Sequence, residues 1–339
     1  MKRTGYTLAL VFALAVAACG GEAASTTTQT APTTTVVETS TTQAETTTTE
    51  VTETTAPAPA AEISFVGADD VESVITDTSR IVSLAGDITE IIFELGLGDQ
   101  VAAIDITTTY PDAAAELPAV GFGQQLAAEP VLAFQPTLII GDETTEPAEA
   151  VQQLRAAGVP VVILPSQTTL DGVSEKIRQI ATILSAREAG EDLVGRVEAD
   201  IAQAQSLIPE VDTPPRVAYV YVRGEQLVLI FGQGIATNAM ITGAGAADAG
   251  AESGVFGAAP LTPEAIVAAA PDVIVLPEAG LAALGGAEAF AQLPGIAETP
   301  AGRNGAFLDY DEAFFFNLGP RVGEALEQFV TDLFGLAGE

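Results

Sequence analysis

From residue 80 onward, short runs of Val, Ile and Leu alternate with stretches of helical periodicity, and this alternation limits the possible folds more than any other feature of the chain. It predicts strands over residues 80–84, 101–105, 137–141 and 159–164, and helices over residues 87–97 and 147–157. Continuous apolar strands separated by helices are typical of a parallel sheet that is covered on both faces. We therefore predict a small doubly wound α/β domain in this part of the chain.

Residues 170–208 have no strand signal and carry helical periodicity throughout, which predicts a long helix followed by a second one. Val173, Ile177 and Ile180 follow helical spacing, and Asp171 is a candidate N-cap. The α/β alternation then resumes, with strands predicted over residues 216–222, 226–231 and 272–276. The sequence thus predicts two α/β lobes on either side of a helical connector.

The N-terminus has a different composition. Lys2 and Arg3 precede an apolar run over residues 8–18, which is too short for a permanent membrane span and is typical of a secretory signal peptide. The run ends in Val-Ala-Ala-Cys, which resembles the lipobox of bacterial lipoproteins, so Cys19 is the expected lipidation site. Cys19 is also the only cysteine, which excludes a disulfide within one chain.

Between the lipobox and the first lobe, residues 19–62 consist mainly of Thr, Ala, Glu, Pro and Ser. Such a segment cannot bury enough apolar surface to offset its ordering entropy, so we predict a disordered tether. The globular part is then expected to work at the extracytoplasmic face of the cell membrane, anchored through lipid on Cys19.

The formal net charge is −34, from 46 acidic and 12 basic residues. A nucleic-acid partner is excluded, because binding to phosphates requires a basic surface. We interpret the acidity as a contribution to solubility.

Several stretches occur in an order that resembles a known family. They are "RIVSLAGDITEIIFELGLGDQVAAIDITTTYPD", "LRAAGVPVVILP", "LTPEAIVAAAPDVIVLPEAG", "LPGIAETPAGRNGAFLDYD" and "NLGPRVGEALEQF". Nearly the whole region from residue 80 resembles class III substrate-binding proteins of bacterial ABC importers, and within that class the haem-binding members.

The resemblance implies a fold of two Rossmann-like α/β lobes joined by a single long backbone helix. The expected organisation starts with a signal peptide (1–18) and a tether (19–62). An N-terminal α/β lobe (63–168), a connecting helix (169–188) and a C-terminal α/β lobe (189–339) follow.

The resemblance also implies an iron ligand. In haem-binding relatives the tyrosine of the Thr-rich Tyr-Pro turn, here Tyr110, ligates ferric iron, which suits a phenolate because it is a hard anionic donor. Without the resemblance, a structural role for this tyrosine would be at least as plausible. The chain contains no histidine, so ligation by a protein histidine is excluded.

Other ligand contacts are less well matched. Relatives often carry arginines where this chain has Gln124 or Gln125, and again where it has Gln233. Arg223 follows the strand predicted over residues 216–222 and could replace one of them at a haem propionate. Its alternative role is that of a solvated loop arginine.

Two glutamates near helix starts, Glu90 and Glu264, match positions through which the family docks onto permease arginines. Either could instead be an ordinary first-turn carboxylate that the helix dipole favours. Because there is one in each lobe, we expect docking.

These observations predict a monomeric binding protein, without enzymatic activity or a catalytic cofactor. It would deliver haem, as its transported ligand, to a permease dimer with a cytoplasmic ATPase and so serve iron uptake. A ferric siderophore or cobalamin is the nearest alternative ligand. An extracytoplasmic α/β enzyme is a further alternative, although no nucleophile motif supports it. A ligand sensor without a transporter would keep Tyr110 but need no docking pair.

Overall fold

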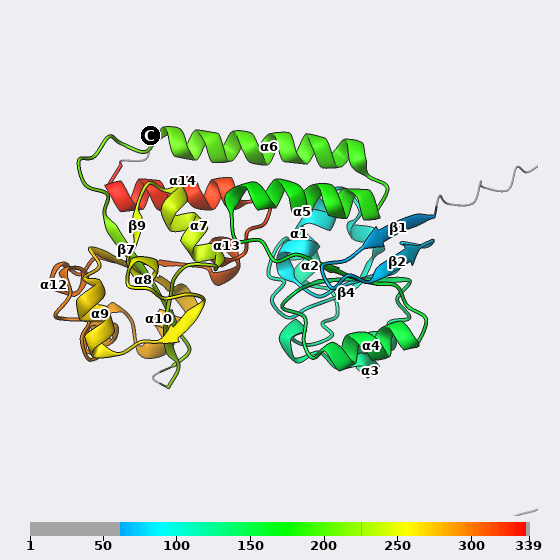
Figure 1. Ribbon diagram of the computed structural model, residues 1–339, viewed down its shortest axis with the longest axis horizontal. Coiled ribbons are helices and arrows are strands. Elements are labelled where there is room, and N and C mark those ends of the chain that lie inside the picture. Colours follow the sequence, from blue (N-terminus) through cyan, green and yellow to red (C-terminus); the bar gives the residue numbers. More distant parts are fainter. Residues whose placement is uncertain (1–61, 225, 337–339) are drawn as a thin grey trace, which may run out of the picture. The chain divides into compact units, whose positions relative to one another are not determined.

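The computed structural model describes residues 62–224 and 226–336 (Figure 1). The predicted signal peptide, Cys19 and all but the last residue of the predicted tether lie outside these residues. Within the described ranges, no helix combines the length and the apolar character that a membrane crossing requires.

The N-terminal lobe contains a four-stranded parallel sheet in the order β4-β3-β5-β6. Its strands are β3 (Ile81–Ser83), β4 (Val101–Ile104), β5 (Leu138–Asp142) and β6 (Val161–Leu164). Every residue of β3, β5 and β6 is buried, as expected for parallel strands covered on both faces. The predicted parallel sheet of this lobe is therefore confirmed.

Short helices and a hairpin complete this lobe. The helices are α1 (Gly86–Glu94), α2 (Asp112–Ala115), α3 (Ala128–Leu132) and α4 (Ala148–Ala156), with 3-10 turns η1 (Gly98–Gln100) and η2 (Gly123–Gln125). An antiparallel hairpin of β1 (Ile63–Val66) and β2 (Glu72–Ile75) precedes the sheet. The hairpin is an addition to the predicted elements, and its strands alternate between more and less exposed residues, as in a half-buried ribbon.

Two helices connect the lobes, α5 (Leu170–Ile183) and α6 (Arg187–Ser206). Figure 1 shows α6 lying along both α5 and α14 (Val322–Phe334). The cap predicted at Asp171 is wrong by two residues. Thr169 is the N-cap, because its hydroxyl accepts a hydrogen bond from the Gly172 amide at 3.2 Å, whereas Asp171 lies in the first turn.

The C-terminal lobe contains a sheet in the order β10-β8-β7-β11-β12, with β9 paired beside β7. Its strands are β7 (Arg216–Val222), β8 (Val228–Phe231), β9 (Ala247–Asp248), β10 (Ala258–Pro260), β11 (Val273–Pro277) and β12 (Phe307–Tyr310). The pairs of β11 with β7 and β12 are parallel, whereas β8 and β10 make an antiparallel edge.

The remaining helices of this lobe lie between its strands along the chain or follow the last strand. They are α7 (Ala236–Gly243), α8 (Ala249–Glu252), α9 (Pro263–Ala269), α10 (Glu278–Leu284), α11 (Ala287–Ala291), α12 (Pro300–Asn304) and α13 (Glu312–Phe316), followed by α14. The predicted α/β class with two lobes is therefore confirmed, whereas the connection, predicted as a single long helix, contains the two helices α5 and α6.

Candidate functional site

The loop that follows β4 carries Tyr110, and the carboxylate of Asp105 fixes its shape. Asp105 is 1% exposed, and its Oδ1 accepts a hydrogen bond from the Thr107 amide at 2.6 Å. Its Oδ2 accepts from the Gly123 amide, also at 2.6 Å. One buried carboxylate therefore holds the Tyr110 loop and the turn that carries Gln124 and Gln125.

A second set of hydrogen bonds supports the threonines before Tyr110. The buried hydroxyl of Thr108 lies 3.2 Å from the Thr89 hydroxyl of α1, which donates to Ser83 Oγ at 2.8 Å. The loop is thus bonded to the first helix and to the end of β3. Tyr110 itself remains 38% exposed, so its side chain stands at the surface of a well-supported loop.

Arg321, just before α14 of the C-terminal lobe, covers one face of Tyr110. Its guanidinium carbon lies 3.7 Å from the centre of the Tyr110 ring, within the range of a cation–π contact. The same guanidinium donates two hydrogen bonds to Glu90, from Nε to Oε1 and from Nη2 to Oε2, each at 3.1 Å. The Arg321 amide adds a third bond to Glu90 Oε1 at 3.2 Å.

This contact corrects the sequence-based interpretation of Glu90. Docking onto a permease requires an exposed carboxylate, but Glu90 is 6% exposed and its two oxygens are occupied by Arg321. Glu90 is covered because the segment before α14 packs onto α1. Burial raises the pKa of the Glu90 carboxyl, although the nearby Arg321 charge opposes that change.

Arg223 belongs to a second cluster, at the end of β7. Its Nε donates to the Tyr221 hydroxyl at 2.7 Å, and its Nη2 donates to Glu312 Oε2 at 2.7 Å. The Tyr221 ring stacks on Phe231, with 5.5 Å between the centroids. The Arg223 side chain is 53% exposed, so it lies at the surface but is held in place by these partners.

The two clusters adjoin the same short helix, α13. Glu312 at its start accepts a hydrogen bond from Arg223. The ring centre of Phe314 lies 5.2 Å from the guanidinium carbon of Arg321. Two residues of helix correspond to about 3 Å along its axis. Tyr110 of one lobe is therefore linked to α13 through Arg321, and Tyr221 of the other is linked to it through Glu312.

The three predicted glutamines are exposed. Gln124 and Gln125 form η2, and Gln233 follows β8, where its amide donates to the Val255 carbonyl at 3.0 Å. Among the residues that the structure describes, none of these three side chains forms a hydrogen bond. The structure thus links Tyr110 to α13 through Arg321 and Arg223 to α13 through Glu312, whereas the three glutamine side chains form no hydrogen bond among the described residues.

Sequence reasoning missed Tyr221 and Arg321. Tyr221 could have been found from the pattern Tyr-Val-Arg at the end of a predicted strand, since such ends line the binding edge of α/β sheets. Arg321 lies within "NLGPRVGEALEQF", but local sequence gives no indication that it reaches Tyr110.

Glu264 is exposed in the first turn of α9, where Thr262 caps the helix by accepting from the Ala265 amide at 3.1 Å. The N-terminal lobe repeats this arrangement. "EPVLAFQPTLII", from Glu129, and "EAIVAAAPDVIV", from Glu264, each contain a helix, a residue of positive φ, a proline and a buried strand. The positive φ values are 49° at Gln135 and 44° at Ala270. Glu129 is exposed in the first turn of α3 and is thus the counterpart of Glu264.

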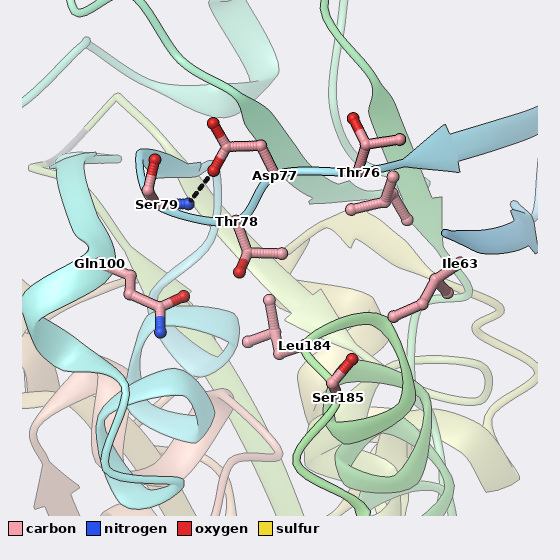
Figure 2. A pocket seen from close by; sticks show the side chains of 9 residues that line it. Ile63, Thr76, Asp77, Thr78, Ser79, Gln100, Leu184 and Ser185 are labelled. Atoms are coloured by element: carbon pink, nitrogen blue, oxygen red, sulfur yellow. Dashed lines mark hydrogen bonds between the residues drawn. The ribbon is translucent and has the colours of Figure 1, made fainter. Parts of the chain in front are cut away.

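A pocket of about 410 Å³ lies elsewhere in the N-terminal lobe (Figure 2). It is lined by Ser79 and Gln100, which precede β3 and β4, and by Ser185 between α5 and α6. Tyr110 follows the opposite end of β4, so this pocket is not part of the Tyr110 site. Within residues 62–224 and 226–336 there is no cluster of His, Cys, Asp or Glu suited to a metal ion.

Comparison with known proteins gives a consistent match. The model of a family described as periplasmic binding protein matches residues 81–313. A solved structure of the periplasmic heme-binding protein RhuT from Roseiflexus sp. RS-1, in its apo form, is 40% identical with a TM-score of 0.74, covering 76% of this chain and 99% of that one.

Two curated relatives add to this. A vitamin B12-binding protein of Vibrio campbellii is 30% identical over 150 residues, which is 44% of this chain and 53% of the relative. The match therefore spans about half the length of that relative. An uncharacterised ABC transporter substrate-binding lipoprotein of Bacillus subtilis is 26% identical over 261 residues, covering 76% of this chain and 81% of that protein.

Proposed function

The chain belongs to the periplasmic binding protein family, and we propose on that basis that it is the substrate-binding lipoprotein of an ABC importer and that it captures haem. The single observation that carries the choice of haem is Tyr110. The partly exposed Tyr110 side chain stands on a hydrogen-bonded loop after a strand. The sequence of the chain is 40% identical to that of a haem-binding protein of known structure. Phenolate oxygen is an established protein ligand of haem iron.

The surroundings of Tyr110 suit a planar ligand with acidic substituents. Ile106 on the same loop is 58% exposed, and Phe256, which packs on Gly234 beside Gln233, is 78% exposed. Ligand sites are mostly apolar with a few placed polar groups, so these two side chains are suited to contact the porphyrin. Arg223, Gln124, Gln125 and Gln233 are the polar groups that we assign to the propionates.

Cobalamin is the second candidate, because the chain is also similar to vitamin B12-binding proteins. A corrinoid would use the same surface around Tyr110 but would not require an iron-bound phenolate. A ferric siderophore would also contact the apolar and polar side chains around Tyr110. It carries its own iron ligands and therefore would not need the Tyr110 phenolate.

We further propose that the protein binds its ligand without altering it and presents it to a permease dimer that is driven by a cytoplasmic ATPase. Docking is assigned to Glu129 and Glu264. The two residues occupy equivalent exposed first turns of the two lobes, whereas Glu90 is buried. A carboxylate on each lobe gives a permease two points of attachment through charged hydrogen bonds.

The experiment is a binding panel. The protein without its signal peptide is dialysed against ferric haem, ferrichrome and cyanocobalamin in turn, and bound ligand is measured by absorption and then identified by mass spectrometry. We expect saturable binding of intact haem and at least tenfold weaker binding of the other two. Preferential binding of cobalamin would replace haem by the second candidate, and recovery of a chemically changed ligand would favour an enzyme.

A further inference from the structure

The position of Tyr110 depends on a residue from the opposite lobe. Arg321 is 211 positions further along the chain, since 321 − 110 = 211, yet its guanidinium lies 3.7 Å over the ring. Glu90, from the same lobe as Tyr110, accepts two hydrogen bonds from this guanidinium. It accepts a third from the Arg321 backbone amide. Arg321 is therefore clamped between two residues of the N-terminal lobe.

The backbone near Arg321 is also in close contact with α1. A Cβ atom placed on Gly319 would lie 3.6 Å from Asp87 Cβ and 3.6 Å from Glu90 Cδ. A Cβ on Gly86 would similarly approach Asn317 Nδ2 at 3.3 Å. The segment before α14 thus lies directly on the N-terminal half of α1, and the arginine side chain has little freedom to leave its position.

The chemistry of this contact matters for an iron ligand. A cation over the face of an aromatic ring attracts its electrons, and the attraction is larger when the ring is a phenolate. The guanidinium is planar and permanently charged, so it can stack on the ring while its edge holds Glu90, which a lysine ammonium cannot do. Arg321 thereby supplies both a fixed orientation and a positive charge to the tyrosine.

We propose that Arg321 is a positioning residue for Tyr110. The C-terminal lobe supplies it, Glu90 anchors it, and it stabilises the phenolate on ferric haem, so that the iron–tyrosine bond depends on contact between the two lobes. This inference rests on the proposed function. Its consequence is that any partner that separates the lobes also withdraws Arg321 from the ring and speeds release of the ligand.

The test uses the full-length protein in detergent, loaded with ferric haem. Arg321→Leu alone would leave the buried Glu90 carboxylate without a partner, so the main variant combines Arg321→Leu with Glu90→Gln. Arg321→Lys keeps the charge but loses the planar fork. Arg178→Leu removes an exposed arginine of α5, which pairs with Glu191, and is the matched control for the loss of one positive charge.

We expect the phenolate-to-iron charge-transfer band of the double variant to move to lower energy, because the phenolate electrons lose a stabilising cation. Haem should dissociate roughly tenfold faster, as expected for the loss of a partly buried cation–π contact. Arg321→Lys should lie between the double variant and the wild type, and Arg178→Leu should match the wild type in both measurements. A merely structural arginine would not move the band.

The outcomes separate this inference from the proposed function. An unchanged band and release rate in the folded double variant, or in Arg321→Lys if the double variant does not fold, would overturn the role of Arg321 while leaving haem as the ligand. If wild-type protein binds no haem, both the proposed function and this inference fail.

Discussion

At the scale of single residues, each tyrosine of the candidate site is paired with an arginine, but the two pairs differ in geometry. Arg321 lies flat over the Tyr110 ring, whereas Arg223 donates to the Tyr221 hydroxyl at 2.7 Å. The first contact leaves the Tyr110 oxygen without a donor from Arg321 and therefore suited to iron. In the second, the Tyr221 hydroxyl accepts from Arg223 and lies 3.5 Å from Glu312 Oε1, so its oxygen is already part of a hydrogen-bonded cluster.

Arg223 gives a prediction at this scale. If Arg223 pairs with a propionate as proposed, Arg223→Ala should weaken haem binding by roughly threefold to tenfold, because one charged hydrogen bond is lost. Protein stability should change by about 1 kcal/mol or less, since the ion pair with Glu312 is half exposed. Isothermal titration with ferric haem and urea unfolding measure the two effects. An affinity equal to that of wild type would return Arg223 to the role of a loop arginine.

The site was only partly predictable from sequence. Tyr110 and Arg223 could be located because parallel strands deliver their C-terminal ends to one edge. Arg321 could not, because Glu90 and Arg321 are 231 residues apart and meet only once both lobes are built. The burial of Glu90 was missed for the same reason, since its cover comes from the far end of the chain.

At the scale of elements, a buried ion pair joins α5 to α1. Lys176 Nζ lies 2.5 Å from Asp87 Oδ2, and the side chains are 3% and 10% exposed. Asp142, at the end of β5, is close enough for its charge to act on Lys176. Burial and the Asp87 charge raise the pKa of the Asp142 carboxyl, while the Lys176 charge lowers it. One lysine therefore serves two buried carboxylates.

Lys176→Met should destabilise the protein by about 3–5 kcal/mol at pH 7, because it leaves buried carboxylates without a cation. The loss should shrink as the pH falls. Without Lys176 the raised pKa of Asp142 rises further, so the native state takes up a proton at a higher pH than the unfolded chain. Stability is then regained between that pKa and the ordinary value of 3.8.

Urea unfolding at pH 7 and pH 5 checks this prediction. Arg178→Met, an exposed substitution on the same helix, is the control and should change stability by about 0.5 kcal/mol or less. A Lys176→Met protein that stays within about 1 kcal/mol of wild type at pH 7 would contradict the account of this ion pair.

Elements were more predictable than contacts between them. The strand predicted over residues 101–105 is β4, and the helix predicted over residues 147–157 is α4, because apolar runs and periodicity are local signals. The hairpin of β1 and β2 was missed, since its strands are only four residues long and carry Ser64, Glu72 and Ser73 among the apolar residues. The cap at Thr169 was missed because two candidate cap residues lie two positions apart.

At the scale of the whole molecule, the two lobes repeat one unit of helix, left-handed residue, proline and strand. Glu129→Ala combined with Glu264→Ala should abolish haem uptake by cells while leaving haem affinity unchanged, since both residues lie in exposed first turns and neither belongs to the hydrogen-bonded clusters around Tyr110 and Arg223. Glu149→Ala combined with Glu278→Ala, first-turn acids of α4 and α10, controls for the loss of two charges. Normal uptake in the first double variant would leave both glutamates as ordinary helix-start carboxylates.

Cys19 gives a prediction for the anchoring of the molecule, although it lies outside the described residues. If it is lipidated, Cys19→Ala should move the protein from the membrane fraction to the soluble fraction without a change in melting temperature. Fractionation after a salt wash, followed by immunoblotting, measures this. A variant that remains in the washed membranes would contradict the lipoprotein assignment.

The central claim is that Tyr110 ligates ferric haem, and the absorption spectrum of haem-loaded Tyr110→Phe tests it most directly. We predict that the phenolate-to-iron charge-transfer band disappears and that affinity falls more than about 100-fold, because residues that merely support a ligand are already worth 10–100-fold. Tyr221→Phe, the matched loss of a hydroxyl in the other lobe, should retain the band. A Tyr110→Phe protein with an unchanged spectrum and affinity, or loss of the band in Tyr221→Phe instead, would contradict the account.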